Sequence, residues 1–219
     1  MKTINVNEII KTVKELSIEA NYYLPNDVKE AIEEAEKNEK WPIANNILNK
    51  ILENSQIAAA EKMPICQDTG MACVFVDIGQ DVHITGGSLE EAINEGVRQG
   101  YAEGFLRKSV VKDPIHRVNT NDNTPALIYY NMVPGDKVKI TVAPKGFGSE
   151  NMSRIAMLKP SDGLEGVKNF VLETVRMAGP NPCPPIVIGV NIRGSFDKVA
   201  YLDKKALIRP VNENNTDEF

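Results

Sequence analysis

The chain of 219 residues is 42% hydrophobic and carries 25 Lys and Arg against 30 Asp and Glu, a net charge of −5 at pH 7. This composition predicts a folded domain with a core, and the interleaved charges, which form no basic block, argue against nucleic acid as a partner. No apolar stretch for export or membrane spanning begins the chain, so a cytoplasmic location without a membrane partner is expected.

Three amphipathic helices are predicted over roughly the first sixty residues, so residues 1–62 are expected to form a helical layer. Asn7 can cap the first helix, in which four apolar residues share a face: Ile9, Ile10, Val13 and Leu16. The break at residues 24–27 begins the second helix, whose mixed Lys and Glu run is expected to face solvent. The third helix follows Trp41 and Pro42.

A loop, a strand and a glycine-striped helix are predicted next. Pro64 and Gly70 mark the loop, and residues 74–78 (V-F-V-D-I) are typical of a strand. Ser88 can cap a helix with one small and apolar face: Leu89, Ala92, Ile93, Gly96, Val97, Gly100, Tyr101, Gly104 and Phe105. Because glycines lower helix propensity, their stripe predicts that another backbone passes close by.

Helices and strands continue to alternate after residue 125. Residues 126–130 and 138–142 are predicted to form an antiparallel pair around a turn at 133–136. Asp162 and Glu165 suggest a capping box for a helix that ends at Gly179. A strand at 185–190, a helix at 196–206 and a frayed, acidic end at 212–219 complete the pattern.

The fold class predicted from this order of elements is α/β or α+β, with an N-terminal helical layer followed by a mixed sheet with flanking helices. Residues 1–219 are expected to be a single domain, made of the helical segment 1–62 and an α/β part over 63–219.

The chain has three cysteines, an odd number, and the expected compartment is reducing. Both facts favour ligand, redox or packing roles for the cysteines over disulfides. Residues 64–70 (P-I-C-Q-D-T-G) group a thiol, an amide, a carboxylate and a hydroxyl in one loop, although a cysteine in a loop is often only a small buried hydrophobe. Residues 179–185 (G-P-N-P-C-P-P) hold Cys183 among four prolines, and a thiol held so rigidly suits a metal better than a core.

Three further stretches are dense in small and polar residues. Residues 117–125 (R-V-N-T-N-D-N-T-P) can form an Asx-rich turn, and residues 145–151 (K-G-F-G-S-E-N) a glycine loop that leads into a helix N-terminus. The third stretch is R-G-S-F-D at 193–197. Each of them alone is weak support for a functional site.

In this order, the motifs resemble the α subunit or N-terminal domain of class I fumarate hydratases and the related L-tartrate dehydratases. The resemblance rests on P-I-C-Q-D-T-G, D-N-T-P-A, K-G-F-G-S-E-N, L-K-P-S-D-G at 158–163 and P-N-P-C-P-P, and extends from about Met63 to Pro210. It implies a hydro-lyase that reversibly hydrates fumarate to L-malate, a reaction of the tricarboxylic acid cycle, with dehydration of tartrate as the alternative.

The resemblance also implies an oxygen-sensitive 4Fe-4S cluster held by three cysteines, with one iron open to bind substrate as a Lewis acid. The matching ligands are Cys66 and Cys183. The third cysteine and a histidine of the family are expected beyond residue 219, so the chain is expected to lack the C-terminal part. Cys73, in an apolar strand, is expected to be buried rather than a ligand.

Four further positions match functional residues of the family. Asp68 is expected to take part in proton transfer, either as the base or by orienting it, and Gln67 to form a hydrogen bond with the substrate. Arg107 is expected to bind a substrate carboxylate, and Gly148 to offer its backbone N–H.

Three positions depart from the family pattern, in which all three are glycine: Asn121, Asn191 and Arg193. The two asparagines are expected to tolerate a left-handed backbone. Arg193 adds a side chain that could obstruct the substrate loop or mark a change of function. Of the histidines, His83 is expected to be structural, and His116 lies beside the candidate loop without forming a metal motif.

The expected partners are a β subunit of the same enzyme, which completes the active site, and a dicarboxylate substrate. A homo-oligomer of α or αβ units is also expected. The competing hypothesis is a cluster-free, non-catalytic binding or assembly component that keeps only the partner surface.

Overall fold

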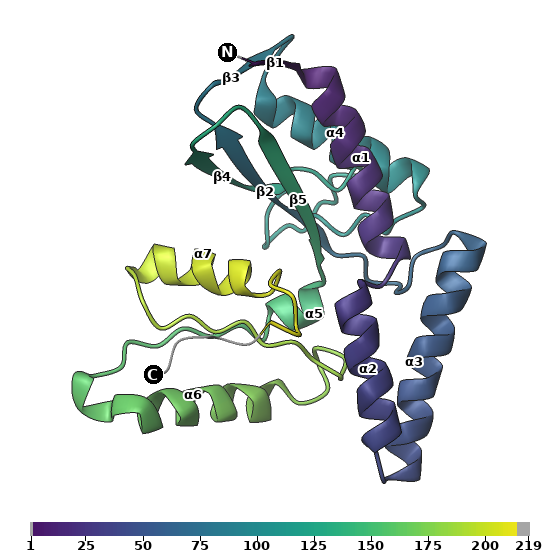
Figure 1. The fold of residues 1–219 in the computed structure, drawn as a ribbon, viewed down its shortest axis with the longest axis vertical. Helices are drawn as coiled ribbons and strands as arrows, with labels where there is room; N and C mark the ends of the chain where they lie inside the picture. The colour runs from purple at the N-terminus through teal and green to yellow at the C-terminus, as the bar shows by residue number, and fades with distance from the viewer. Residues whose placement is uncertain (1, 214–219) are drawn as a thin grey trace. The chain divides into compact units, whose positions relative to one another are not determined.

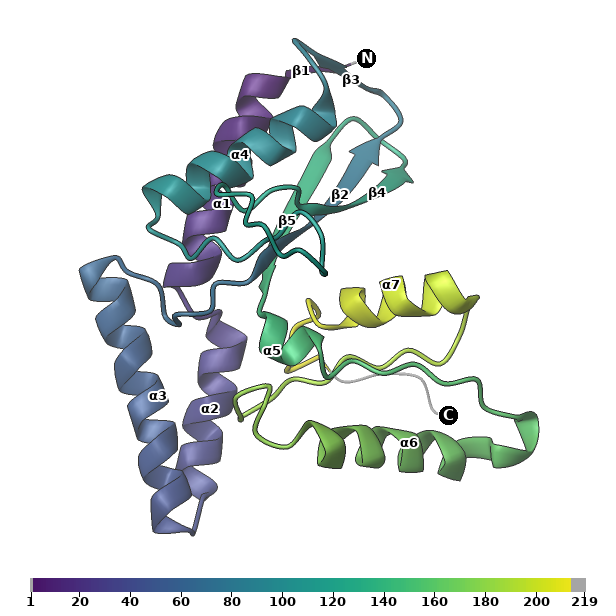
Figure 2. The same ribbon diagram turned by 180° about the vertical axis from the view of Figure 1, so that it is seen from behind.

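The computed structural model describes residues 2–213, so most of the predicted frayed end lies outside the described residues. The chain divides into two compact units, Met1–Gly146 and Phe147–Phe219, and each is described by itself. The single domain over residues 1–219 stays a prediction. The alternation of helices and strands and the mixed sheet confirm the predicted α/β class (Figures 1 and 2).

The elements of the first unit are, in chain order, β1 (Lys2–Asn5), α1 (Val6–Tyr22), α2 (Asn26–Asn38), α3 (Pro42–Glu61), β2 (Met71–Gly79), β3 (Val82–Thr85), α4 (Leu89–Glu103), β4 (Leu127–Val133) and β5 (Val138–Lys145). Those of the second unit are α5 (Phe147–Glu150), the 3-10 helix η1 (Pro160–Asp162), α6 (Gly163–Ala178) and α7 (Phe196–Ala206). Among the described residues, no helix is both long and apolar enough to cross a membrane.

Helix α1 begins two residues earlier than predicted. The cap is Asn5, not Asn7: the Asn7 N–H donates to Asn5 Oδ1 (2.9 Å), and the Glu8 carboxylate accepts from the Asn5 N–H (3.4 Å). The short strand β1, which pairs in parallel with β3, holds Asn5 in the extended conformation that a cap requires. The cap was misplaced because β1 was not predicted.

The main sheet has the order β4-β2-β5, so the predicted pairing of β4 with β5 is wrong. Strand β2 lies between them, parallel to β4 and antiparallel to β5. The turn at residues 133–136 therefore carries the chain across the end of β2 rather than closing a hairpin. The side chains of β2 are buried over Ala72–Val76, as expected for a central strand.

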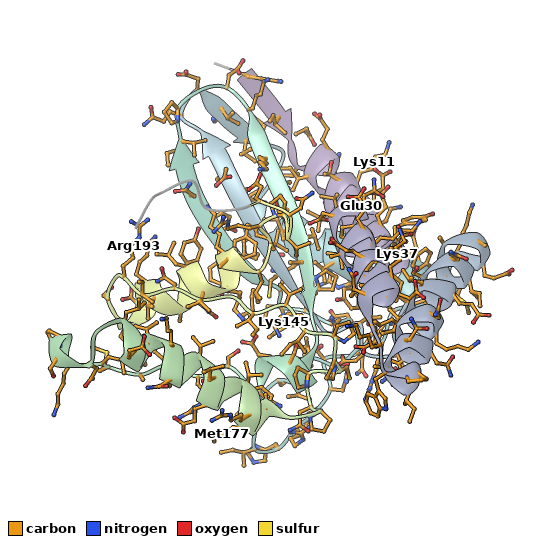
Figure 3. All side chains as sticks on the ribbon, turned by 60° about the horizontal axis from the view of Figure 1, so that its bottom comes forward. Lys11, Glu30, Lys37, Lys145, Met177 and Arg193 are labelled. Atoms are coloured by element: carbon orange, nitrogen blue, oxygen red, sulfur yellow. The ribbon has the colours of Figure 1, made fainter. Side chains whose placement is uncertain are left out.

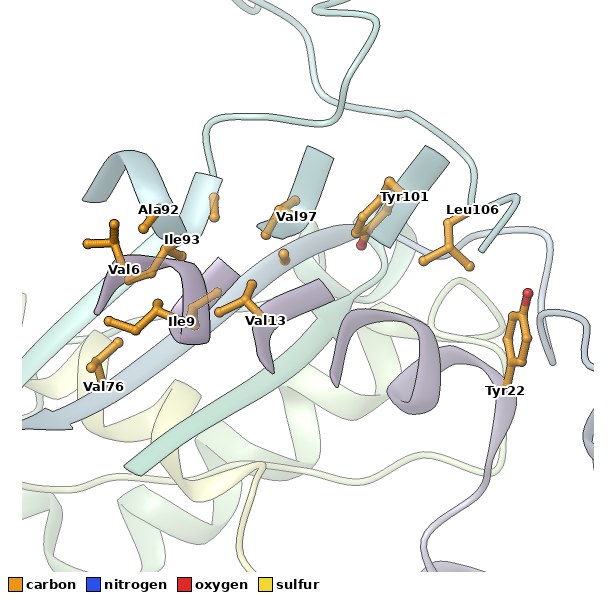
Figure 4. Packing of buried hydrophobic residues seen from close by; sticks show 13 residues of the cluster. Val6, Ile9, Val13, Tyr22, Val76, Ala92, Ile93, Val97, Tyr101 and Leu106 are labelled. Atoms are coloured by element: carbon orange, nitrogen blue, oxygen red, sulfur yellow. The ribbon is translucent and has the colours of Figure 1, made fainter. Parts of the chain in front are cut away.

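The core of the first unit lies between β2 and the helices α1 and α4, where Val13, Val74, Ile93 and Val97 are fully buried. Figure 4 shows Val13, Ile93 and Val97 in this cluster. The glycine stripe of α4 lets α1 approach closely, as predicted. A Cβ on Gly96 would lie 2.7 Å from the Val13 Cβ, and one on Gly100 would lie 2.9 Å from the Ser17 Cβ. Helix α4 ends before Phe105, so this residue is exposed and its expected place on the buried face is wrong.

A Gly96→Ala variant tests this packing. Alanine improves helix propensity by about 1 kcal/mol, but overpacking a core costs about 1–3 kcal/mol, so we expect a net loss of stability of up to about 2 kcal/mol. The free energy of unfolding in urea measures the change. Ala102→Gly on the exposed side of α4 is the control for propensity alone. A Gly96→Ala protein more stable than wild type would contradict the close contact.

Helices α2 and α3 pack on one another, whereas α1 packs mainly on α4 and the sheet, so residues 1–62 are three helices but not one layer. The charged side of α2 faces solvent as predicted: Glu30 and Lys37 are exposed (Figure 3). Lys29 and Glu33 form an i,i+4 ion pair at 3.8 Å.

Two predictions for the second unit are wrong in detail. Helix α6 forms with Asp162 at its N-cap position, but the side chain makes no capping hydrogen bond, because its carboxylate accepts from the Lys159 N–H (2.7 Å) and closes η1 instead. Residues 185–190 form no strand, since the described residues provide no paired partner for them. The predicted helix at 196–206 is confirmed as α7.

Candidate functional site

The loop that carries Cys66 leaves the end of α3 and enters β2. It is fixed to the helices by its backbone, since the Ile65 N–H donates to the Asn21 carbonyl (2.9 Å) and the Asn54 amide donates to the Ile65 carbonyl (2.8 Å). The side chain of Cys66 is exposed, and the Asp68 N–H points at its Sγ (3.4 Å). Cys66 is therefore not the small buried hydrophobe that the sequence analysis gave as its alternative role.

The end of this loop is in close contact with β5. Gly70 has a φ of +62°, and a Cβ on it would lie 2.2 Å from the Lys145 carbonyl oxygen. The Gly70 N–H donates to Asp68 Oδ1 (3.1 Å), which orients the carboxylate predicted to handle protons. Only glycine fits both the conformation and the space at this position.

A second segment, residues 107–110, lies against the loop. The hydroxyl of Thr69 donates to the Arg107 carbonyl (3.2 Å), and the hydroxyl of Tyr101 lies 3.0 Å from the Thr69 carbonyl. Burial of Tyr101 raises the pKa of its phenol, so the hydroxyl remains a donor across the physiological range. The structure therefore brings the backbone around Asp68 and Arg107 together, and the Arg107 side chain is exposed.

The Asx-rich stretch forms the third part of the site in the first unit. Asn121 has a φ of +68°, which confirms the expected left-handed backbone. Asp122 accepts hydrogen bonds from the Thr124 N–H (3.0 Å) and hydroxyl (2.8 Å) and forms an ion pair with Arg98 of α4 (3.0 Å). Asn123 is fully buried and connects to both other segments.

The charge of Asp122 predicts a pH dependence of stability. Burial alone would raise the pKa of this carboxyl, but hydrogen bonds from Thr124 and Arg98 outweigh burial and lower the pKa to about 2, from an ordinary 3.8. A lowered folded-state pKa stabilises the protein above the ordinary value, and this contribution is lost as pH falls through about 2. Because the side chain is 28% exposed, we expect about 1–2 kcal/mol after allowance for solvent screening.

An Asp122→Asn variant should therefore unfold more easily than wild type at pH 7, and the difference should shrink as the pH falls from about 4 to 2. Urea unfolding of both proteins at pH 7, 4 and 2.5 measures it. A difference that stays constant over this range would show that the carboxylate charge does not contribute.

Cys183 lies in the second unit, in a tight turn after α6. Its N–H donates to the Pro180 carbonyl (3.0 Å), its φ is +58°, and its side chain is exposed. Gly148 faces this turn, because a Cβ on it would lie 2.9 Å from the Asn181 carbonyl oxygen. The candidate residues thus form two groups: Cys66, Gln67, Asp68 and Arg107 in the first unit, and Gly148 and Cys183 in the second.

Four other residues considered in the sequence analysis lie outside the two groups: Cys73, His83, His116 and Arg193. Cys73 is 1% exposed in β2, which confirms its burial. His83 is exposed on β3, and His116 is exposed with its Nδ1 3.1 Å from Asp113 Oδ1. Arg193 is exposed on the loop before α7 (Figure 3), and its φ is not positive, so the backbone there does not require glycine.

Each of the two groups holds one thiol of the kind that binds iron-sulfur clusters. Two exposed thiols are soft ligands for iron, and an N–H directed at Sγ is the kind of contact that tunes cluster thiolates. Within residues 2–213, no three His, Cys, Asp or Glu residues form a group that could hold a metal ion. Among the described residues, neither unit by itself gathers three such ligands.

The sequence interpretation missed Tyr101 and Asn123 as parts of the site, and it noted Thr69 only as the hydroxyl of the Cys66 loop. Tyr101 was assigned only to the apolar face of α4, and its hydroxyl bonds could not be read from helical periodicity. Asn123 belongs to the D-N-T-P-A motif, which was the available signal, but its contacts reach residues 13 to 53 positions away.

The chain is similar to one known protein family and to proteins with related names. The model of the fumarate hydratase (Fumerase) family matches residues 10–219. A Methanocaldococcus jannaschii protein, provisionally named L(+)-tartrate dehydratase subunit alpha, is 45% identical over 217 residues, which cover 96% of this chain and 76% of that protein. The L(+)-tartrate dehydratase subunit alpha of Escherichia coli strain UTI89 is 30% identical over 214 residues, covering 96% and 70%.

Proposed function

The chain belongs to the fumarate hydratase (Fumerase) family as an α-subunit member, and we propose that it forms, with a β subunit, an iron-sulfur hydro-lyase for four-carbon hydroxy-dicarboxylates. The observation that carries the proposal is the Cys66 loop, in which an exposed thiol, Gln67 and Asp68 are held by hydrogen bonds beside the segment of Arg107. Elimination of water from a dicarboxylate needs an acid at the leaving hydroxyl, a base at the neighbouring C–H and a cation for the carboxylates. A cluster held by the thiol would supply the first, Asp68 the second and Arg107 the third.

Cys66 and Cys183 would hold the 4Fe-4S cluster together with a third ligand. When bound, the cluster supplies Lewis-acid chemistry at the substrate hydroxyl. The chain's own residues bind and orient the substrate: Arg107 pairs with a carboxylate and Gln67 with a substrate oxygen. Asp68, held by the Gly70 N–H, moves the proton of the neighbouring C–H directly or orients the group that does. The N–H of Gly148 donates to the substrate.

The names of the relatives favour tartrate as the substrate. The two relatives described above are both named L(+)-tartrate dehydratase subunit alpha, whereas the sequence interpretation favoured fumarate. Loss of water from tartrate gives an enol that tautomerises to oxaloacetate. Hydration of fumarate to L-malate is the second candidate, supported by the description of the family model.

The same names support a second subunit, since an α subunit implies a β subunit. We propose an assembly of α and β subunits in which the partner completes the substrate site. This chain without its partner should then be inactive.

The test is an anaerobic assay of the chain co-produced with its β subunit. Oxaloacetate formed from L(+)-tartrate is followed through a coupled NADH reaction, and fumarate and malate by ultraviolet absorbance. Faster turnover of tartrate supports the first candidate, and faster turnover of fumarate supports the second. A brown but inactive preparation with both acids would overturn the assignment of substrate class.

The non-catalytic alternative makes a different prediction. A cluster-free assembly component should remain colourless after anaerobic reconstitution with iron and sulfide. A visible absorption shoulder that disappears in air would instead support the enzyme.

A further inference from the structure

Asn123 is the only fully buried Asn among residues 2–213, and its side chain joins two segments that are distant in sequence. Its Oδ1 accepts from the Ser109 N–H (2.7 Å) and the Val110 N–H (3.1 Å), and its Nδ2 donates to the Gly70 carbonyl (3.0 Å). Gly70 ends the Cys66 loop, and Ser109 follows Arg107 by two residues. We call these three hydrogen bonds the Asn123 clasp.

Residue type matters at this position. The backbone of Asn123 has a φ of +62°, a conformation that Asn adopts more readily than most residues. An amide also offers an acceptor and a donor at once, and the clasp uses both. An aspartate would keep the acceptor and lose the donor, and an alanine would lose both.

Tyr101 supports the clasp from α4. Its hydroxyl lies 3.0 Å from the Thr69 carbonyl and 3.2 Å from the Gly70 carbonyl, and the Thr69 hydroxyl donates to the Arg107 carbonyl. Because burial raises the pKa of Tyr101, this donor is not lost near neutral pH, although hydrogen bonds from the Asn123 and Asn21 side chains oppose the rise.

We propose that Asn123 is a positioning residue, which fixes the segment of Arg107 against the Cys66 loop so that the carboxylate-binding guanidinium keeps one geometry relative to Asp68 and the cluster ligand. The proposal rests on the proposed function for the roles of Arg107 and Asp68. The clasp itself is a property of the folded chain and can be tested without substrate or cluster.

Hydrogen exchange of the full chain provides that test. In Asn123→Ala, the amides of Ser109 and Val110 should exchange about tenfold faster or more, because a buried acceptor is removed. In Asn123→Asp, these two amides should stay protected, while those of Asp68 and Gly70 should exchange faster. Ser17→Ala, which removes a buried side-chain hydrogen bond to Val13 elsewhere in the same unit, is the matched control and should change neither group.

Unchanged exchange at Ser109 and Val110 in Asn123→Ala, or an increase spread evenly over the first unit in all three variants, would overturn the proposal. Should Asn123→Ala fail to fold, the contrast between the two groups of amides in Asn123→Asp decides alone.

Kinetics of the reconstituted αβ enzyme separate positioning from general stability. Asn123→Asp should keep the wild-type iron content and raise KM about tenfold with a smaller change in kcat, because Arg107 would bind the carboxylate in the ground state and the transition state alike. An unchanged KM would overturn the positioning role. If wild type turns over neither acid while the exchange contrast is present, the proposed function fails and the clasp stands.

Discussion

Cys66→Ala should abolish turnover of both tartrate and fumarate and remove the visible absorption of the anaerobically reconstituted enzyme. Loss of a partner in the outer shell of a metal site already costs about 10–100-fold, so removal of a direct ligand should cost more than about a hundredfold. The fold should survive, because Cys66 is exposed and contributes no packing to the core. Iron analysis, absorption spectra and turnover of the same preparation measure the effect.

Cys73→Ala is the matched control for this variant. It removes a buried thiol from β2, so it should reduce thermal stability but leave iron content and turnover per folded molecule unchanged. Retained activity in Cys66→Ala, or loss of iron in Cys73→Ala with Cys66 intact, would mean that the ligand was assigned to the wrong cysteine.

Gly70→Ala should destabilise the first unit by more than about 4 kcal/mol, because strain at a positive φ and a steric overlap act together. The overlap is with backbone, since the new Cβ would lie 2.2 Å from the Lys145 carbonyl oxygen and 2.6 Å from the Gly146 nitrogen. Neither atom can move without shifting β5 or the residue after it. Urea unfolding, or the yield of soluble protein if the variant does not fold, measures the loss.

Gly135→Ala separates strain from overlap. Gly135 also has a positive φ, +107°, but nothing lies within 4 Å of its added Cβ, so the cost should be about 1–3 kcal/mol from strain alone. Equal losses in the two variants would contradict the tight contact between the Cys66 loop and β5.

Local features of the fold were predictable because each depends on residues near in sequence. Ser88 caps α4 as predicted, with its hydroxyl accepting from the Glu91 N–H, and the glycine stripe of α4 receives the backbone of α1. The left-handed backbone at Asn121 was also correctly predicted from the tolerance of Asn for that conformation.

Long-range features were not predictable from one sequence. The position of β2 between β4 and β5 depends on pairing between strands some 50 to 75 residues apart, whereas a turn between β4 and β5 suggested a hairpin. At Asp162 the competing contact is local: its carboxylate accepts from the Lys159 N–H, three residues earlier, and the capping pattern did not exclude this alternative. Local patterns predict which groups can form hydrogen bonds. Which partner each group has depends on the folded structure.

The candidate site shows the same division. The resemblance singled out Cys66, Asp68 and Arg107 as candidates, because their residue types suit the proposed chemistry. The supporting groups Tyr101 and Asn123 act through geometry, and this became visible only when the helix and the loops were placed together.

Mössbauer spectroscopy of the αβ enzyme, reconstituted with iron-57 and measured with and without tartrate or fumarate, tests the central claim most directly. If this chain contributes two thiolates to a cluster with one open iron, the spectrum should show a 4Fe-4S centre in which one iron changes on addition of substrate. A preparation with no cluster signal, or a cluster whose iron signals do not change when tartrate or fumarate is added, would contradict the hydro-lyase assignment.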